Sequence, residues 1–522
     1  MANSVIGILI ALLVAAIPLV ALAQRINISY PIVLVLGGLA LGFVPRLPHI
    51  PLDPDLVLLI FLPPLLYWES ITAPTDVMAE NASQIALLAV GLVVATTFAV
   101  AALAHVLIPG MSWGAAFVLG AVVSPTDELA AVPVLEHFRL PRHLIAIIDG
   151  ESLLNDATSL VIYGAAIVAV TTGVFHPAYA LFEFVMTLAG SLLLGYLAGR
   201  LAVELWRRIR DPQLQGVISV VLPFAAYFPA ERFGLSGVLA VVTAGVYVNH
   251  LSPRVITPAA RTQAAGFWNT FVFLANAVLF LAVGLQLNDV ATAAFRHHSW
   301  QTIIGYSIAV NVVLIVVRLA LAVLAEFAPT PAPADHAEPN WKNALVVAWS
   351  GLRGSVSLAA ALAIPLLLPN GAPFPDRDLI IFITFSVILV TLVAGGLTLP
   401  ALVGWLHIER GTEESDELRF ALVRTAEAAL ARIDELQSEK RIDDAHAETL
   451  RNVYEHRRDM KATEGGADGR HLARHREVER ELIDAQRKAL IALREQGKID
   501  NVVLRRVQTD LDFATGRSAL SE

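Results

Sequence analysis

Apolar segments about as long as a bilayer is thick recur along the first 406 residues, and this repetition constrains the fold more than any motif. A helix needs about 20 predominantly apolar residues to cross the hydrocarbon core of a membrane. By this criterion we predict thirteen membrane helices, at residues 4–23, 29–45, 54–70, 84–108, 112–136, 143–171, 178–205, 213–229, 234–250, 264–287, 300–327, 342–367 and 378–406. The sequence therefore predicts an all-α polytopic membrane protein whose membrane domain is residues 1–408.

Composition supports this class and excludes others. Hydrophobic residues make up 56% of the chain and charged residues only 16%, whereas soluble proteins average about 25% charged residues. The charges crowd after residue 408, so residues 409–522 read as a cytoplasmic, mainly helical, charged tail. The chain has no cysteine, which excludes disulfides, thiolate metal sites and a cysteine nucleophile. Nothing in it suggests a nucleic-acid partner.

The basic residues of the predicted loops indicate an orientation. If the N-terminus is outside, the cytoplasmic loops hold Arg25, Arg139, Arg142, Arg207, Arg208, Arg210, Arg254, Arg261 and Lys342. The outer loops then hold only Arg46, Arg232, Arg296 and Arg377. This bias follows the positive-inside rule. We therefore expect a multi-pass protein of the cell (inner) membrane, with its N-terminus outside and its tail in the cytoplasm.

A polar stretch from Asp149 to Ser159 begins the sixth predicted helix and is the strongest functional signal. On a helix, Glu151 shares a face with Asn155, and Ser152 shares a face with Asp156. A charge at the bilayer centre costs about 2.5–3.5 kcal/mol on insertion scales, so these carboxylates must face protein or water. The alternative is a helix end among the lipid headgroups. Apolar segments on both sides favour an ion site.

Two of the thirteen helices are predicted to be broken. Pro125 interrupts the fifth helix, because proline removes a backbone donor and clashes with the preceding turn. Gly351 and Gly354 loosen the twelfth helix on either side of Arg353. Paired interruptions of this kind indicate an inverted-repeat transporter with its site near the midplane. The repeat units would be helices 4–6 and 11–13, although we find no residue-level repeat between them.

Two arginines lie at membrane depth: Arg318 in the eleventh predicted helix and Arg353 in the broken twelfth. Arg318 has no other charge for several residues on either side; it either snorkels to an interface or pairs with a carboxylate, for which Glu151 is the candidate. Arg353 either pairs in the same way or neutralises the carbonyl ends of its own broken helix. Asp127 either caps the facing half-helix, where acids are favoured, or binds the ion.

The oxygen donors of this region suit an alkali cation. They are the Asp156 carboxylate, the Ser152 hydroxyl, the Asn155 amide and a freed carbonyl or hydroxyl at Thr126. A carboxylate that binds either a cation or a proton gives exchange by competition. If Asp156 alone titrates, the exchange is one for one and the membrane potential does not drive it. Glu151 would add a second titrating site unless Arg318 holds it ionised.

Three blocks match a known family in order and at similar spacing: 124–127 (Ser-Pro-Thr-Asp), 150–156 (Gly-Glu-Ser-Leu-Leu-Asn-Asp) and 351–354 (Gly-Leu-Arg-Gly). Together they resemble the monovalent cation–proton antiporters of the bacterial and animal sodium–proton exchanger type. The resemblance covers roughly residues 54–408, including the segment 61–67 (Phe-Leu-Pro-Pro-Leu-Leu-Tyr). The tail also looks like that of the longer bacterial members, with less specificity.

The resemblance implies a role for each matched residue. It implies that Asp156 binds cation and proton in turn beside Asn155, while Ser152 and Thr126 complete the cation shell. The Asn155–Asp156 pair resembles the electroneutral branch, since electrogenic relatives tend to carry two aspartates there. Within the core, the resemblance implies a charge network of Asp127, Glu151, Arg318 and Arg353, in which Glu151 pairs with Arg318 and the other two offset the helix ends.

The resemblance also implies an assembly and a cycle. Helices 1–3 and 8–10 would form a homodimer, and a core of helices 4–6 and 11–13 would move between inward- and outward-open states, with the two broken helices, 5 and 12, crossing inside it. The function predicted is exchange of a monovalent cation, Na⁺ or else Li⁺ or K⁺, for H⁺, without a cofactor and without enzymatic chemistry. A K⁺-selective K⁺/H⁺ antiporter and a passive cation channel are the alternatives. A serine enzyme is disfavoured because no histidine lies near enough to serve as its base.

Overall fold

The computed structural model describes residues 2–26, 28–43, 60–128, 138–172, 177–296, 299–327, 340–408 and 413–463, with isolated residues elsewhere. The chain divides into two units, residues 1–411 and 412–522. The described residues contain helices and irregular segments but no β-strand, only two isolated bridges, Asp127–Leu352 and Leu367–Pro373. The predicted all-helical class is therefore confirmed.

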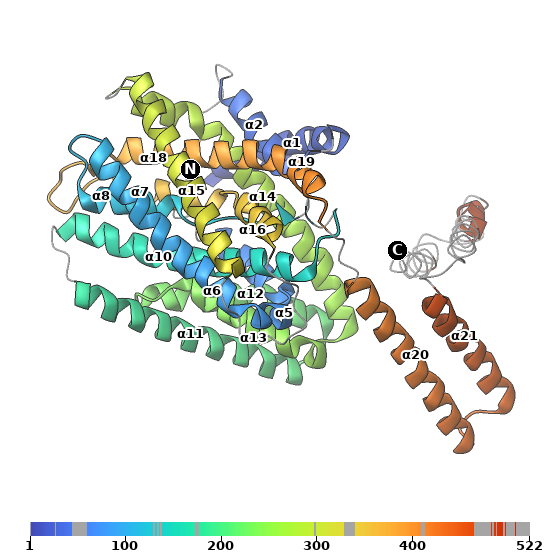
Figure 1. The fold of residues 1–522 in the computed structure, drawn as a ribbon. Helices are drawn as coiled ribbons and strands as arrows, with labels where there is room; N and C mark the ends of the chain where they lie inside the picture. Colours follow the sequence, from blue (N-terminus) through green and yellow to red (C-terminus); the bar gives the residue numbers. More distant parts are fainter. Residues whose placement is uncertain are drawn as a thin grey trace. The chain divides into compact units, whose positions relative to one another are not determined.

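The helices of the first unit follow one another along the chain (Figure 1). Its first half contains α1 (Ala2–Ile26), α2 (Tyr30–Gly42), α4 (Leu62–Thr72), α5 (Thr75–Glu80), α6 (Ala82–Ala86), the π-helix η1 (Leu87–Leu92), α7 (Val93–Leu107), α8 (Trp113–Val123) and α10 (Arg142–Thr172). Its second half contains α11 (Pro177–Arg208), α12 (Pro212–Arg232), α13 (Gly237–Val255), α14 (Pro258–Ala294), α15 (Trp300–Phe327), α16 (Trp341–Ser350), α17 (Ser355–Leu362), α18 (Arg377–Leu389), the π-helix η2 (Val390–Gly395) and α19 (Gly396–Leu406).

Fewer described helices than predicted are long and apolar enough to cross a membrane. Seven qualify: Ala82–Leu107, Arg142–Thr172, Phe184–Arg208, Pro212–Arg232, Pro258–Ala294, Trp300–Phe327 and Arg377–Leu406. Three shorter apolar helices are Ile10–Ile26, Tyr30–Gly42 and Trp113–Val123. Six of the thirteen predicted segments therefore have no qualifying helix among the described residues. The segments at 112–136 and 342–367 are interrupted, and residues 54–59 of another predicted helix lie outside the described residues. The segments at 4–23 and 29–45 correspond to the shorter helices, and α13 (Gly237–Val255), at 234–250, is not among the seven.

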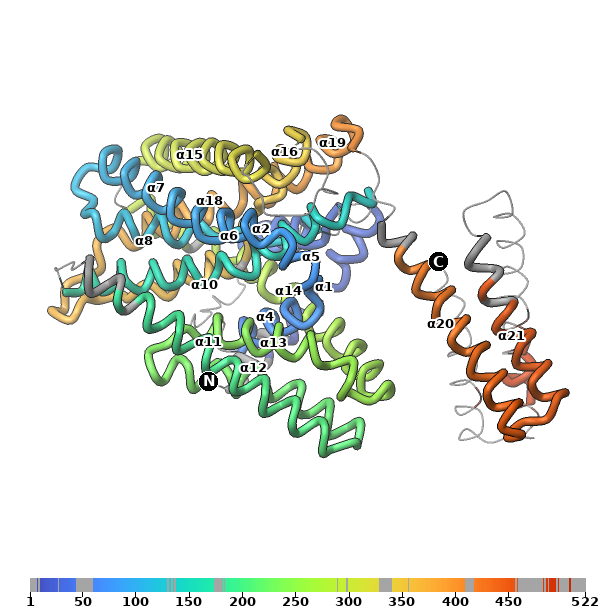
Figure 2. Tube along the Cα trace, turned by 60° about the horizontal axis from the view of Figure 1, so that its bottom comes forward, coloured from blue at the N-terminus to red at the C-terminus, as the bar shows by residue number. Residues whose placement is uncertain are grey.

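The central helix of the first unit is α10, which carries the polar stretch. Figures 1 and 2 both show it running between α7 and α8 on one side and α11–α13 on the other. Its faces enter different hydrophobic clusters: Leu144 and Ile147 pack with α15 and α16, Ala166 packs with α7 and α8, and Leu153 and Ala157 pack with α11–α13. Protein therefore surrounds the start of α10, which shields its charged residues from lipid.

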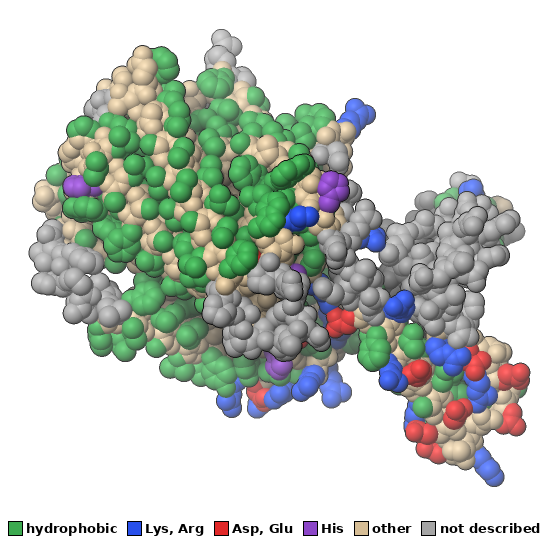
Figure 3. Space-filling model, in the orientation of Figure 1, with side chains coloured by type: hydrophobic (Ala, Val, Ile, Leu, Met, Phe, Trp, Pro, Cys, Tyr) green, Lys and Arg blue, Asp and Glu red, His purple; other side chains and the backbone are tan. Residues whose placement is uncertain are grey.

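The second unit is built on a helical hairpin of α20 (Glu413–Ser438) and α21 (Asp444–Thr463). Ala426, Ile433 and Ala447 are buried between the two helices. Arg451 ties them together, since its Nη2 lies 2.6 Å from Asp434 Oδ1 and 3.1 Å from Gln437 Oε1. Acidic and basic side chains mix over this hairpin, whereas apolar side chains cover most of the visible face of the first unit (Figure 3).

Helices α2 and α14 approach so closely that their backbones touch. A Cβ atom on Gly38 would meet the carbonyl oxygen of Leu281, and one on Gly284 would meet that of Val35. Both contacts would be with backbone, which cannot rotate away as a flexible side chain can. The two glycines are therefore required for this crossing.

We predict that Gly284→Ala destabilises the protein by about 1–3 kcal/mol, because the added methyl group overpacks the crossing. Gly266→Ala is the matched control in the same helix, where a Cβ would meet no atom within 4 Å. Alanine is the better helix former, so the control should gain roughly 0.5–1 kcal/mol. Thermal unfolding of both variants in detergent measures the difference, and equal midpoints would contradict the prediction.

Candidate functional site

Two interrupted helices meet in the middle of the first unit. Helix α8 ends at Val123 and the chain continues without helix to Glu128; helix α16 ends at Ser350 and α17 begins at Ser355. The N–H of Asp127 donates to the carbonyl of Leu352 at 2.8 Å. The interruptions expected at Pro125 and at Gly351–Gly354 thus lie side by side and are joined by a backbone hydrogen bond.

Arg318 of α15 and Glu151 of α10 form a buried ion pair beside this meeting point. Arg318 Nη1 lies 2.6 Å from Glu151 Oε1, and Nη2 lies 3.1 Å from Oε2. The two residues are only 3% and 1% exposed. Arg318 also donates to the carbonyls of Ala348 at 2.7 Å and Val347 at 2.9 Å, in the last turn of α16. One guanidinium therefore holds Glu151 through both oxygens and satisfies the end of an interrupted helix.

Arg353 satisfies the ends of both interrupted helices. Its Nη1 donates to the Gly351 carbonyl at 2.6 Å, at the end of α16, and its Nε donates to the Val123 carbonyl at 3.3 Å, at the end of α8. The Asp127 carboxylate lies against Gly354, which caps the N-terminus of α17; a Cβ on Gly354 would collide with it. A negative group there complements the helix dipole. The structure thus places Asp127 at a helix end as well as at the cavity described below.

Thr126 connects the ion pair to α10. Its hydroxyl donates to Glu151 Oε1 at 2.8 Å and accepts from Asn155 Nδ2 at 2.7 Å. Its carbonyl accepts from the Ser152 hydroxyl at 3.1 Å and again from Asn155 Nδ2 at 3.2 Å. Three residues of the polar stretch therefore fix Thr126. The Asn155 Nδ2 group makes both of these bonds to Thr126, whereas Asn155 Oδ1 is buried without a hydrogen-bond partner among the described residues.

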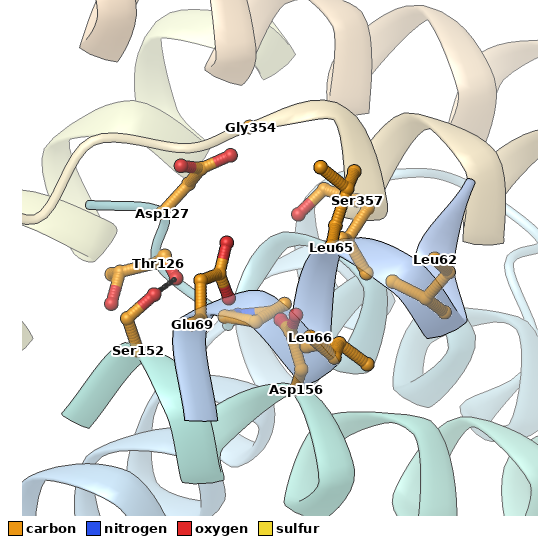
Figure 4. A pocket seen from close by; sticks show the side chains of 12 residues that line it. Leu62, Leu65, Leu66, Glu69, Thr126, Asp127, Ser152, Asp156, Gly354 and Ser357 are labelled. Atoms are coloured by element: carbon orange, nitrogen blue, oxygen red, sulfur yellow. Dashed lines mark hydrogen bonds between the residues drawn. The ribbon is translucent and has the colours of Figure 1, made fainter. Parts of the chain in front are cut away.

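Asp156 opens onto a small cavity beside these groups (Figure 4). The cavity measures about 30 Å³, counted as the space open to the centre of a water-sized sphere. A single water needs roughly 10–15 Å³ by this measure, so the cavity has room for a small ion or about two waters. Its lining is Leu62, Leu65, Leu66, Glu69, Pro125, Thr126, Asp127, Ser152, Asp156, Gly354, Val356 and Ser357.

Of the eight residues singled out from the sequence, four line the cavity and four stand behind it. Asp156, Ser152, Thr126 and Asp127 face the cavity, whereas Asn155, Glu151, Arg318 and Arg353 lie outside its lining. Glu151 and Asn155 of the second group hold Thr126, while Arg318 and Arg353 satisfy the ends of the interrupted helices behind the cavity.

Sequence reasoning missed Glu69 and Ser357. Glu69 of α4 extends its carboxylate into the cavity, on the side of Asp127 and Asp156, and Ser357 of α17 lies across from it (Figure 4). Glu69 is a charged residue inside a predicted membrane helix, a signal that by itself marks a functional position. Ser357 carries no such signal, because a serine in a membrane helix commonly bonds its own backbone.

The cavity brings carboxylates together with neutral oxygens. Among the described residues, no group of three or more histidine, aspartate or glutamate side chains is arranged to hold a metal ion. Any cation here would therefore be held by carboxylates together with hydroxyl and carbonyl oxygens, a donor set typical of hard cations.

Comparison with known proteins agrees with this geometry. The family described as "Sodium/hydrogen exchanger, transmembrane" matches residues 8–405. The chain belongs to this family. An uncharacterised Na⁺/H⁺ exchanger of Mycobacterium tuberculosis is 35% identical over 518 residues, covering 97% of this chain and 95% of that protein. This exchanger is thus an integral, multi-pass membrane protein, and the resemblance seen in its motifs is confirmed.

Two further proteins are similar to this exchanger. A sodium, potassium, lithium and rubidium/H⁺ antiporter of Bacillus pumilus is 34% identical over 386 residues, which are 72% of this chain and 58% of that protein. The solved structure of the sodium proton antiporter MjNhaP1 from Methanocaldococcus jannaschii matches with a TM-score of 0.61 over 77% of this chain and 98% of that one. At 19% identity, this second likeness shows the fold alone.

We predict that Glu151→Gln lowers the free energy of unfolding of the exchanger by about 3–5 kcal/mol, because it leaves the Arg318 charge buried without its partner. Asp378→Asn is the control: it breaks the more exposed Arg377–Asp378 pair, 3.9 Å apart, which is worth about 0–1 kcal/mol. Thermal unfolding in detergent compares the two.

A double-mutant cycle then isolates the buried pair. Glu151→Gln combined with Arg318→Met should cost less than the sum of the two single changes, because the double variant removes both charges and leaves neither buried without a partner. Arg318→Met should still be costly by itself, since Val347 and Ala348 lose a donor. Strictly additive losses would show that the two side chains do not interact.

Proposed function

We propose that the exchanger transports one monovalent cation against one H⁺, with both competing for Asp156 in an alternating-access cycle. The observation that carries this proposal is the division between two neighbouring acids of α10. Glu151 is held by Arg318 through both carboxylate oxygens, whereas Asp156 faces the cavity and has no ion pair among the described residues. Of these two acids, Asp156 is therefore the one that can change partners.

The cation shell follows from the cavity lining. Asp156 supplies the charge, and Ser152, Thr126 and Glu69 supply further oxygens. The small cavity favours Na⁺ or Li⁺ as the transported ion, and the Bacillus pumilus relative named for sodium, potassium, lithium and rubidium supports testing K⁺ as well. Protons and monovalent cations are then the partners of the exchanger, and no cofactor takes part.

The stoichiometry depends on Glu69 as well as Asp156. We propose that Glu69 keeps one protonation state throughout the cycle and that Asp156 alone exchanges its proton. Each cycle then moves one positive charge in each direction. Because no net charge crosses, a membrane potential, worth about 2.3 kcal/mol per charge per 100 mV, does no work on the exchange.

The assembly is proposed on the same basis. Helices α1, α2, α4 and α12–α14 would form the interface of a homodimer. A core built from α6–α10 and α15–α19, which contains both interrupted helices, would move past it. The exchanger would lie in the cell (inner) membrane, with its N-terminus outside and residues 409–522 in the cytoplasm. The close crossing of α2 with α14 supports a rigid dimer-forming part.

Asp156→Asn should abolish cation-dependent proton movement, since asparagine cannot carry the exchanged proton. The assay uses proteoliposomes with an acidic interior, in which internal pH is followed after Na⁺, Li⁺ or K⁺ is added outside. Asp211→Asn is the matched control: Asp211 is exposed and caps α12, and asparagine caps equally well. If the unmodified protein carried cation currents without proton movement, the antiporter proposal would be wrong and a passive cation channel would be the better interpretation.

Voltage tests the roles of the two cavity acids. In the same proteoliposomes, clamping the membrane potential at several values should leave the Na⁺/H⁺ exchange rate unchanged. Glu69→Gln should raise the KM for Na⁺, because the carboxylate of Glu69 is replaced by a neutral amide with one oxygen fewer. The exchange should stay independent of voltage. A voltage-dependent rate that becomes independent in Glu69→Gln would show instead that Glu69 titrates in the cycle.

A further inference from the structure

The ends of α11, α12, α13 and α14 carry a group of exposed arginines outside the exchange site. Five of them lie on or next to the two turns that join these helices: Arg207, Arg208, Arg210, Arg254 and Arg261. Figure 3 shows basic side chains gathered along one edge of the first unit, where its apolar surface ends. We call this group the arginine edge.

Carboxylates neutralise the arginine edge only in part. Glu204 lies 3.7 Å from Arg207 and 2.8 Å from Arg208. Asp211 uses its Oδ1 to accept from the N–H of Leu214 at 2.9 Å, as the cap of α12. Among the described residues, two acids are therefore seen at the five arginines, and the edge keeps a positive charge.

A buried glutamine fixes the two turns of the arginine edge against each other. Gln215 is 2% exposed. Its Nε2 lies 2.8 Å from the carbonyl of Ile209 and 3.4 Å from that of Val255, and its Oε1 accepts from the N–H and the hydroxyl of Thr257, each at 3.0 Å. The turns before α12 and before α14 are thus held together by one side chain. The arginines are presented on a preformed surface.

An apolar groove on the outer face of α11 and α12 leads to this edge. The groove has a volume of about 550 Å³, and every side chain that lines it is apolar. Leu194, Leu201 and Leu205 line it from α11, and Val217, Val221 and Pro229 line it from α12. Because the two helices are antiparallel, Leu205 and Val217 mark the end nearest the arginines.

We propose that the groove and the arginine edge together bind an anionic phospholipid, with an acyl chain along the groove and the phosphate at the arginines. Lipid tails are as apolar as the groove, so the chain alone would not select one lipid over another. Arginine binds phosphate through paired N–H donors, and a cluster of basic residues at the membrane surface favours anionic lipids. The selection therefore comes from the headgroup and the position from the groove. This binding does not depend on the exchange reaction.

Native mass spectrometry of the full-length protein tests the proposal. The detergent-purified protein is mixed with equal amounts of phosphatidylglycerol and phosphatidylcholine of the same chain length, and the bound lipids are counted. We expect phosphatidylglycerol to be retained several-fold over phosphatidylcholine. Arg207→Gln combined with Arg208→Gln should reduce this preference by roughly fivefold or more. Arg232→Gln, at the opposite end of α12, is the control and should leave the preference unchanged.

A second variant tests the groove without touching a charge. Ala225 is exposed and lines the groove, so Ala225→Phe should fill it and lower the retention of phosphatidylglycerol. Ala320→Phe places the same side chain at an exposed position of α15 and should not. Equal retention of both lipids by the unmodified protein would overturn the proposal. The proposal would also be overturned if the preference for phosphatidylglycerol survived both the arginine variant and the groove variant. The same holds if Ala225→Phe converted a dimer to monomers while lipid retention stayed the same, because the groove would then bind a second copy of the chain.

Discussion

Every backbone carbonyl at membrane depth needs a hydrogen-bond donor, and the site of this exchanger depends on how two arginines meet that need. Interrupting α8 and α16 leaves carbonyl groups without their helical partners, which lipid would not tolerate. Arg353 donates to Val123 and Gly351, and Arg318 donates to Val347 and Ala348. Without these donors the two chain segments could not stay extended side by side, and the cavity between them would close.

The same arginines decide which acids remain available. Arg318 pairs with both oxygens of Glu151 while it caps α16, so the charge that stabilises the interrupted backbone also fixes one acid of α10. Asp156, five residues after Glu151 on the same helix, has no such partner among the described residues and faces the cavity. A structural requirement of the backbone thus leaves two acids five residues apart in different surroundings: Glu151 is held in an ion pair and Asp156 faces the cavity.

The sequence predicted much of this site because its signals are local. Proline and paired glycines mark interruptions wherever they occur in a helix, and a charge in an apolar run demands a partner, so Pro125, Arg353 and Arg318 could be interpreted alone. Asn155 was expected among the cation ligands; its Nδ2 donates to Thr126, a contact that the sequence could not show because helical spacing gives a face but not its neighbour. Glu69 carried a sequence signal as well, a charge inside a predicted membrane helix, but its place beside Asp156 depends on how α4 packs against α10. The count of thirteen helices is not confirmed for a related reason: hydropathy alone cannot distinguish one continuous span from two halves.

Interrupting the backbone also supplies a ligand that a continuous helix would hide. Within a helix, the Thr126 carbonyl would accept from a residue four positions later; here it faces α10 and accepts from Ser152 and Asn155. These two bonds use both lone pairs of the oxygen. On the proposed exchange, rotation of the Ser152 hydroxyl would free one lone pair of the Thr126 carbonyl for a cation held by Asp156. Loss of the Asp156 proton together with a bond rotation in one side chain would then open the shell to a cation, and the interrupted backbone could stay fixed while it happens.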